Sequence, residues 1–103
     1  MPGGGGLVPV SIKDLSFDPP NVMINKGDTV IWTNTVAVPH TVSSNKSGGQ
    51  NFICPPVSAE VFDSGATPLS LNQTFQHTFN NSGTFAYHCE VHGCVMAGTV
   101  TVM

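Results

Sequence analysis

Apolar residues recur at every second position over short stretches of the chain, which is the pattern of half-buried β-strands. The clearest stretch is 29–34, where Val30 and Trp32 fall on one face. No long segment repeats apolar residues at helical spacing. A first strand is predicted over 8–17, where the alternation slips near Asp14, with these inward side chains: Val8, Val10, Ile12, Leu15 and Phe17.

Further strands are predicted between clusters of turn residues, at 22–25, 40–43, 74–79, 84–89 and 98–102. Two of them flank the turn-rich segment 80–83, which predicts a β-hairpin. Short strands in this number, with no helix, predict a single antiparallel β-sandwich or barrel of about seven to eight strands.

One long segment, 44–60, does not alternate. It is rich in Ser, Gly, Asn and Pro, and it holds Cys54. Loops of this length in compact domains are usually functional or disordered, and a cysteine inside one indicates that the loop is tied down. The first residues, 1–6, lack the basic and apolar regions of a signal peptide and are predicted to be a flexible linker. The remainder, 7–103, is predicted to be one domain with a long inserted loop.

The charge of the chain limits its partners. Only 9% of its 103 residues are charged, and the net charge is −3. Without a basic patch, nucleic acid is excluded as a partner. The apolar runs have the length of strands, so no membrane span is predicted.

Three cysteines are an odd number for a protein that forms disulfides. They are Cys54, Cys89 and Cys94. The count fits either three thiols, or one disulfide and one cysteine with a separate role. A disulfide would place the protein outside the cytosol.

The segment 87–96, YHCEVHGCVM, gathers side chains that bind soft transition metals. Cys89 and His92 lie three residues apart, Met96 follows, and His40 is a distant candidate. Two imidazoles and one thiolate, with a weak axial thioether, form the ligand set of blue copper electron-transfer sites. This set suits both Cu(I) and Cu(II), so little rearrangement accompanies electron transfer.

Other metal sites fit less well. A structural zinc site needs four strong ligands, and Cys89, His92 and Cys94 would still require one more while leaving Met96 without a role. Catalytic zinc needs a nearby base, and Glu90 is the one acidic residue in the segment. A binuclear copper centre needs two bridging cysteines at a closer spacing than Cys89 and Cys94.

These motifs resemble the cupredoxins, specifically the plastocyanin, amicyanin and pseudoazurin group. The resemblance runs from about Val8 to Val102 through FDPPNVMINKGDTVIWTN, VPHTV, VFDSG, TFQHTF, GTFAYHCEVHG and MAGTVTV. It implies an all-β Greek-key sandwich and a non-enzymatic carrier of single electrons. It also implies one mononuclear type 1 copper held by four ligands: His40, Cys89, His92 and Met96.

Two departures from the family pattern bear on the site. Three residues, 93–95, separate His92 from Met96, which is not the usual family loop length. The segment 42–61 is longer than in simple relatives. A red-copper relative uses a Glu ligand, so Glu60 stands as an alternative ligand for an atypical site.

Cys94 is predicted to pair with Cys54. A free thiol two residues from His92 would compete for the metal and would be open to oxidation. A disulfide removes both problems and pins the long loop against the metal loop. The alternatives are a free Cys94 that alters the site and a disulfide between two molecules.

Two histidines are predicted not to bind metal. His77 is assigned to the polar face of its strand, opposite Phe75 and Phe79. His88 precedes Cys89, so its side chain points away from the site, and it is assigned to the surface. The resemblance gives His88 one further role, as a remote port for electrons.

Copper that cycles between Cu(I) and Cu(II) implies redox protein partners. The electron is expected to pass through the exposed edge of His92, within an apolar docking rim made of Ala37, Val38, Pro39, Val91 and Val95. The protein is expected to be a periplasmic or extracellular monomer, with 1–6 as a candidate membrane tether. The alternatives are a copper module for storage, delivery or sensing, and a domain of a longer chain such as a multicopper enzyme.

Overall fold

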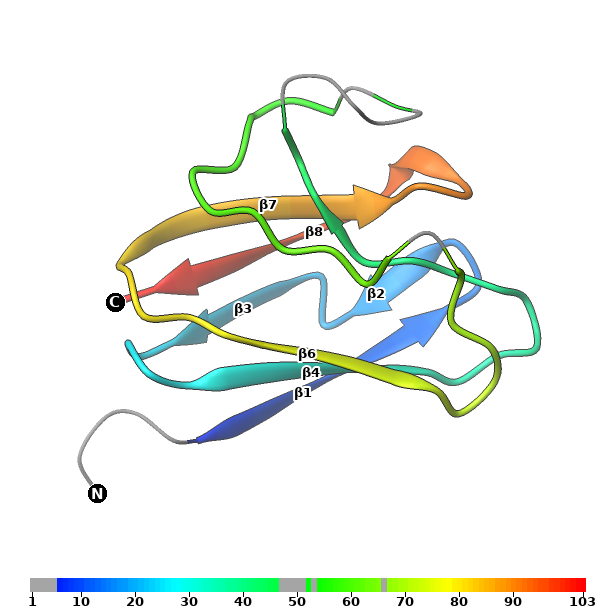
Figure 1. Cartoon of the computed structure of the whole chain (residues 1–103), viewed down its shortest axis with the longest axis horizontal. Helices are drawn as coiled ribbons and strands as arrows, with labels where there is room; N and C mark the ends of the chain where they lie inside the picture. The colour runs from blue at the N-terminus through cyan, green and yellow to red at the C-terminus, as the bar shows by residue number, and fades with distance from the viewer. Residues whose placement is uncertain (1–5, 47–51, 53, 66) are drawn as a thin grey trace.

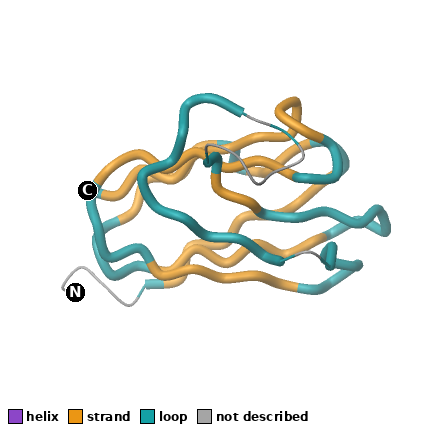
Figure 2. The backbone as a smooth tube through the Cα atoms, turned by 45° about the horizontal axis from the view of Figure 1, so that its top comes forward, coloured by secondary structure: helices purple, strands orange, loops and turns teal. Residues whose placement is uncertain are grey.

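In the part of the chain that the structure describes, eight strands form two facing sheets (Figures 1 and 2). The computed structural model describes residues 6–46, 52, 54–65 and 67–103. One sheet has the order β2-β1-β4-β6 and the other β3-β8-β7-β5. The strands are β1 (Leu7–Lys13), β2 (Ser16–Asp18), β3 (Asn21–Ile24), β4 (Thr29–Asn34), β5 (Ser43–Ser44), β6 (Thr74–Thr78), β7 (Gly83–Cys89) and β8 (Gly93–Val102). The expected all-β sandwich is confirmed.

The sheets are mixed, whereas the sequence predicted purely antiparallel ones. Strand β1 runs parallel to β4, and β3 runs parallel to β8, while the remaining pairs are antiparallel. The parallel pairs arise because the chain crosses between the sheets before it returns beside an earlier strand. Local alternation carries no information about such crossings.

The predicted strand 8–17 is in fact a β-hairpin. Ile12 pairs with Phe17, and a two-residue turn at Asp14 and Leu15 joins β1 to β2. The slip in the alternation marks this turn. Leu15 was therefore wrongly placed in the core: it has a φ of 61° and is 53% exposed, whereas Val10 is buried.

The predicted hairpin of 74–79 with 84–89 is wrong. Strand β6 pairs with β4, in the register Trp32 to Phe75, whereas β7 pairs with β5 and β8 in the opposite sheet. The connection crosses from one sheet to the other. It does so because Phe79 and Phe85, at its two ends, both bury their rings in the core between the sheets.

The core is centred on Trp32, which is fully buried in β4. Its ring centroid lies 5.9 Å from that of Phe62, 5.6 Å from that of Phe75 and 5.3 Å from that of Tyr87. Val30 is buried on the same face, as the alternation predicted. Aromatic rings from both sheets therefore interlock around one residue.

Burial of Tyr87 makes stability depend on pH in the alkaline range. Burial raises the pKa of Tyr87 from 10.0 to about 12, against a smaller opposing effect of the Trp32 side chain. The raised pKa means that the folded state favours the neutral phenol. The stability that this residue contributes is therefore fully present below pH 10. It is lost as the pH rises towards 12. The shift corresponds to about 3 kcal/mol.

The measurement is the free energy of unfolding of wild-type protein and Tyr87→Phe at increasing pH. Tyr87 is the chain's one tyrosine, so tyrosinate absorption follows this residue alone. The wild-type protein should lose stability above pH 10 relative to Tyr87→Phe. Titration of folded Tyr87 near the ordinary pKa, with equal slopes for the two proteins, would contradict this expectation.

The ends of the sandwich differ. In Figure 1 the start of β1 and the C-terminus lie at the left-hand end, and the turn between β7 and β8 lies at the right-hand end. At the left, Gly6 accepts a hydrogen bond from the backbone N–H of Thr29. The predicted linker residues 1–5 lie outside the described part. The described part of the chain holds no helix that could span a lipid bilayer.

Candidate metal centre

Three of the predicted ligands meet at one point. Cys89 ends β7, His92 lies in the turn to β8, and His40 lies in the loop that follows β4. The donor atoms of these three residues all lie within 4.8 Å of one another. They form the one group of potential metal ligands among the described residues.

The geometry of this group fits a metal bound by two imidazoles and one thiolate. Cys89 Sγ lies 3.5 Å from Nδ1 of His92 and 3.8 Å from Nδ1 of His40. Bonds of about 2.0 Å to nitrogen and about 2.3 Å to sulfur, arranged at trigonal angles, place such donors roughly 3.7 Å apart. A soft thiolate with two imidazoles is a donor set that suits copper.

The position of His40 is fixed by a backbone bridge to Leu69 and by the buried side chain of Asn34. Its backbone forms a two-way bridge with Leu69, with N···O distances of 3.2 and 2.8 Å. The Asn34 side chain donates to the carbonyl groups of Val38 and Leu69 and accepts from the N–H of Val36. The buried Asn34 amide therefore fixes the loop that leads from β4 to His40.

Thr41 supplies polar contacts around the sulfur. Its backbone N–H points to Cys89 Sγ at 3.4 Å, a contact that favours the thiolate. Its hydroxyl accepts the N–H of Glu90 at 2.7 Å. Thr41 thus ties the loop after His40 to the strand end that carries Cys89.

The turn from β7 to β8 depends on Gly93. This residue has a φ of +84°, which side chains rarely tolerate, and it pairs with Cys89 across the turn. A Cβ at Gly93 would lie 3.1 Å from two ring carbons of Phe52. The positive φ allows the tight turn in which His92 lies beside Cys89.

Met96, the fourth predicted ligand, is fully buried in β8. It belongs to the same cluster of buried side chains as Cys89. Burial suits an axial thioether, but it suits a core methionine equally. The role of Met96 therefore stays a prediction.

The electrostatics of the site favour a neutral His40. Burial lowers its pKa below the ordinary 6.5, and the neighbouring His92 lowers it further, while Asp14 opposes both effects. A neutral imidazole has a lone pair available for a metal. Protons therefore compete less for His40 than for an exposed histidine.

His77 and Glu60 lie together, apart from the three donors. The His77 ring bonds to the Glu60 carboxylate through Nε2, and Asn81 donates to the other carboxylate oxygen. His77 was predicted to lie on the polar face of its strand, opposite Phe79. This prediction is wrong, because the His77 ring stacks on Phe62 and packs against Phe79. Residues 77 and 79 share a strand face, which places His77 beside Phe79.

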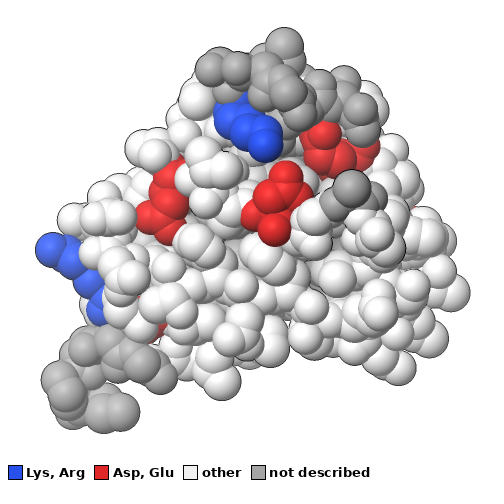
Figure 3. Space-filling view, viewed as in Figure 1, with Lys and Arg blue, Asp and Glu red and all other residues white. Residues whose placement is uncertain are grey.

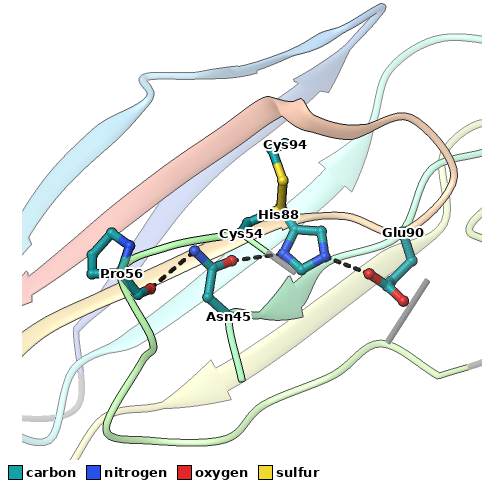
Figure 4. Close-up of a disulfide and its surroundings, with 6 residues drawn as sticks. All are labelled: Asn45, Cys54, Pro56, His88, Glu90 and Cys94. Carbon is teal, nitrogen blue, oxygen red and sulfur yellow. Dashed lines mark hydrogen bonds and ion pairs between the residues drawn. A yellow bond between two sulfur atoms is a disulfide. The ribbon is translucent and has the colours of Figure 1, made fainter. Parts of the chain in front are cut away.

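His88 is fully buried, so its assignment to the surface is wrong. Its Nδ1 donates to the amide oxygen of Asn45 at 2.6 Å, and its Nε2 bonds to the carboxylate of Glu90 (Figure 4). The side chain is not among the three clustered donors. Because its ring is covered, His88 offers no exposed edge for an electron port.

The predicted disulfide is present. Cys54 and Cys94 are joined, with their Cα atoms 5.4 Å apart (Figure 4). The remaining cysteine, Cys89, is the free buried thiol at the candidate centre. The long segment after β5 is therefore covalently attached between His92 and Met96.

Sequence reasoning missed the supporting residues Asn34, Thr41 and Asn45. A signal existed for Asn34, because it shares the inward face of β4 with Val30 and Trp32, where a polar side chain needs a structural reason. The buried positions of Thr41 and Asn45 follow from contacts between distant segments, and no local pattern marks them.

Comparisons with known proteins agree with this geometry. The family model described as "Copper binding proteins, plastocyanin/azurin family" matches residues 6–103. Amicyanin-alpha of Methylorubrum extorquens is 39% identical over 97 residues, covering 94% of this chain and 72% of the relative. Plastocyanin of Scenedesmus fuscus is 30% identical over 89 residues, covering 85% of this chain and 87% of the relative. The crystal structure of amicyanin from Paracoccus versutus superimposes with a TM-score of 0.73 at 30% identity, over 93% of this chain and 80% of that one.

Proposed function

The chain belongs to the plastocyanin/azurin family of copper-binding proteins, and on this basis we propose that it carries single electrons between redox partners. In this proposal it acts as a monomer with one type 1 copper. The ligands are His40, Cys89, His92 and Met96. The observation that carries the proposal is the close approach of three donor atoms, all within 4.8 Å.

Each donor has a distinct task in this proposal. Copper, when bound, supplies a one-electron couple between Cu(II) and Cu(I). The Cys89 thiolate provides a covalent path for the electron, and the two imidazoles suit both oxidation states. Met96 offers a weak thioether that tunes the potential. Thr41 orients its N–H towards the sulfur.

His92 is the proposed exit for the electron. The side chains of His40, Cys89 and Met96 are fully buried, whereas His92 is partly exposed. A partner at this end of the sandwich would therefore meet the imidazole edge of His92 before any other ligand.

The surface near His92 supports docking by apolar contact. All five residues of the predicted rim are exposed: Ala37, Val38, Pro39, Val91 and Val95. Val95 also borders a hollow of about 340 Å³ with Leu15 on the β1–β2 turn. Leu15 was not part of the predicted rim, and the hollow that it shares with Val95 is also lined by the ion pair of Lys13 and Asp18.

Charges contribute little to docking in this proposal. On the face drawn in Figure 3, charged side chains gather in the upper half and at the left edge, and the right-hand end below them is uncharged. The whole chain has a net charge of −3. Steering of partners should therefore be weak and only slightly sensitive to salt.

A location outside the cytosol fits the disulfide. Such bonds form and persist in oxidising compartments such as the periplasm and the extracellular space. The Cys54–Cys94 bond therefore supports a periplasmic or extracellular location. Storage or delivery of copper is less favoured, because the described residues hold a single cluster of candidate ligands.

The docking surface can be tested with Val95→Asp. Val95 is 80% exposed, so the change should leave the fold and the copper spectrum intact. Electron self-exchange between copper-loaded molecules, measured by NMR line broadening, should slow by at least about tenfold, because two copies would each bring a like charge to the contact.

Met23→Asp is the matched control. Met23 is 69% exposed, pairs with Thr101 in β8 and gives the same change in net charge. It should slow self-exchange far less. Equal slowing by the two variants would reject the surface around His92. Slow exchange in the wild-type protein itself would favour storage over electron transport.

A further inference from the structure

Three polar side chains form a row of hydrogen bonds beside the end of β7, and none of them belongs to the donor cluster. We call these residues, Asn45, His88 and Glu90, the clamp. Figure 4 shows the His88 ring between the other two side chains. Asn45 and His88 are buried, and the Glu90 side chain is only 17% exposed. A buried polar row in which both ring nitrogens are bonded specifies one local geometry.

Asn45 fixes one end of the clamp. Its side-chain amide donates to the carbonyl of Pro56 at 3.1 Å, so its oxygen faces the His88 ring and accepts from Nδ1 at 2.6 Å. Its backbone N–H donates to the carbonyl of Ala86 at 2.9 Å. The position of the His88 ring is therefore set from a segment outside the metal loop.

Glu90 connects the other end of the clamp to the sulfur. Its carboxylate bonds to Nε2 of His88. Its backbone N–H donates to the Thr41 hydroxyl at 2.7 Å, and the backbone N–H of Thr41 points to Cys89 Sγ at 3.4 Å. The clamp is thus continuous with the polar contact that the thiolate receives.

The clamp also bridges Cys89 along the chain, because His88 precedes this residue and Glu90 follows it. The ladder between β7 and β8 shifts its register at the same point: His88 pairs with Ala97, whereas Cys89 pairs with Gly93. Shifts of this kind bend a strand and change the direction of its side chains. The direction of the Cys89 side chain therefore depends on how its two neighbours are held.

We propose that His88 and Glu90 are positioning residues for the metal centre: the bond between their side chains spans Cys89 and fixes the rotamer in which its sulfur meets the two imidazoles. Neither residue touches the metal. This inference rests on the proposed function for the identity of the metal. It gives the buried His88 a task in place of the electron port expected from the sequence.

The test is Glu90→Ala, which removes the carboxylate and leaves the His88 ring in place. In copper-free protein, the three-bond NMR couplings between the α- and β-protons of Cys89 report its χ1 rotamer. The wild-type protein should show the couplings of a single rotamer, and Glu90→Ala should show averaged couplings. Couplings of one unchanged rotamer in Glu90→Ala would overturn the proposal.

The second measurement uses copper-loaded protein. The affinity for copper, measured by competition with a chelator, should fall at least about tenfold in Glu90→Ala. The EPR hyperfine splitting should change as well, because the direction of the sulfur sets its overlap with Cu(II). Unchanged affinity and an unchanged EPR spectrum would contradict the proposal.

Two control variants separate the bond from its charge and from general stability. Glu90→Gln should behave like the wild-type protein, since an amide can present either its oxygen or its N–H to Nε2. Glu60→Ala is the matched control, because Glu60 bonds to His77 Nε2 and its side chain is also 17% exposed. It should change neither the Cys89 couplings nor the copper site. If Glu90→Gln behaves like Glu90→Ala, or if Glu60→Ala has the same effects, the proposal is wrong.

Two further points keep the test decisive. If Glu90→Ala does not fold, Glu90→Asp replaces it, since the shorter side chain keeps the charge but withdraws the carboxylate from His88. Because the couplings are measured in copper-free protein, they decide whether the clamp fixes Cys89 even if the wild-type protein lacks a type 1 spectrum. Such a spectrum would reject the proposed function alone, so the two failures are distinguishable.

Discussion

Replacement of Cys89 by Ser should abolish the intense visible absorption of the copper-loaded protein and its electron transfer. The absorption of a type 1 site arises from charge transfer between thiolate sulfur and Cu(II), and Cys89 is the chain's free cysteine. A hydroxyl is far less readily ionised than a thiol, and its oxygen is a harder donor. The two imidazoles could still hold copper, but without the covalent sulfur path.

The measurement is a titration with Cu(II), followed by optical and EPR spectroscopy. The wild-type protein should reach full intensity at one equivalent of copper, and Cys89→Ser should remain nearly colourless. Cys54→Ala/Cys94→Ser is the matched control, since it removes the other two cysteine sulfurs and should retain an intense band. A coloured Cys89→Ser protein would show that another group supplies the charge transfer, and a colourless wild-type protein would reject the type 1 site.

Replacement of Trp32 by Ala should lower the free energy of unfolding by about 3–5 kcal/mol. Trp32 is fully buried and lies against Phe62, Phe75 and Tyr87, so the change leaves a cavity that rigid neighbours from both sheets cannot fill. Total stabilities of such domains are about 5–15 kcal/mol, so a large share would be lost. Denaturant unfolding of copper-free protein, followed by circular dichroism, measures the change.

Two variants control for this result. Trp32→Phe keeps an aromatic ring in the core and should cost clearly less than Trp32→Ala. Met23→Ala removes an exposed side chain and should change stability by less than about 0.5 kcal/mol. A loss for Trp32→Ala as small as that for Met23→Ala would mean that the core does not depend on this ring.

Local patterns predicted the strands better than their pairing. The alternation over 29–34 gave the bounds of β4 and the burial of Trp32, because side-chain direction in a strand depends only on position along the chain. The partners of a strand depend on how distant segments pack. For this reason the segments 74–79 and 84–89 were predicted as a hairpin, although they lie in different sheets.

The donor types were predictable for a similar reason. Cys89 and His92 lie three residues apart, so one turn holds them together, and the chemistry of their side chains indicates a soft metal. His40 is 49 residues from Cys89 in sequence. Its place was expected from family resemblance, while the contact itself arises from the bridge to Leu69 and the buried amide of Asn34.

His88 shows where the same reasoning fails. Alternation indicates that its side chain lies opposite that of Cys89, but the far side of a strand can face either solvent or another part of the chain. Here the His88 ring is fully buried and bonds to Asn45 and Glu90. The composition of 44–60 indicated a loop, and nothing local specified the surface on which it would lie.

The sequence by itself therefore determined an all-β chain, the inward face of β4, and a soft-metal donor set in 87–96. Those features depend on residue types and on neighbours within a few positions. Only the tertiary structure decided the mixed sheets, the approach of His40 to Cys89, the burial of His88 and the bond between Cys54 and Cys94. Each of these depends on contacts between segments far apart in the chain, whose free energy is set by the packing of the whole core.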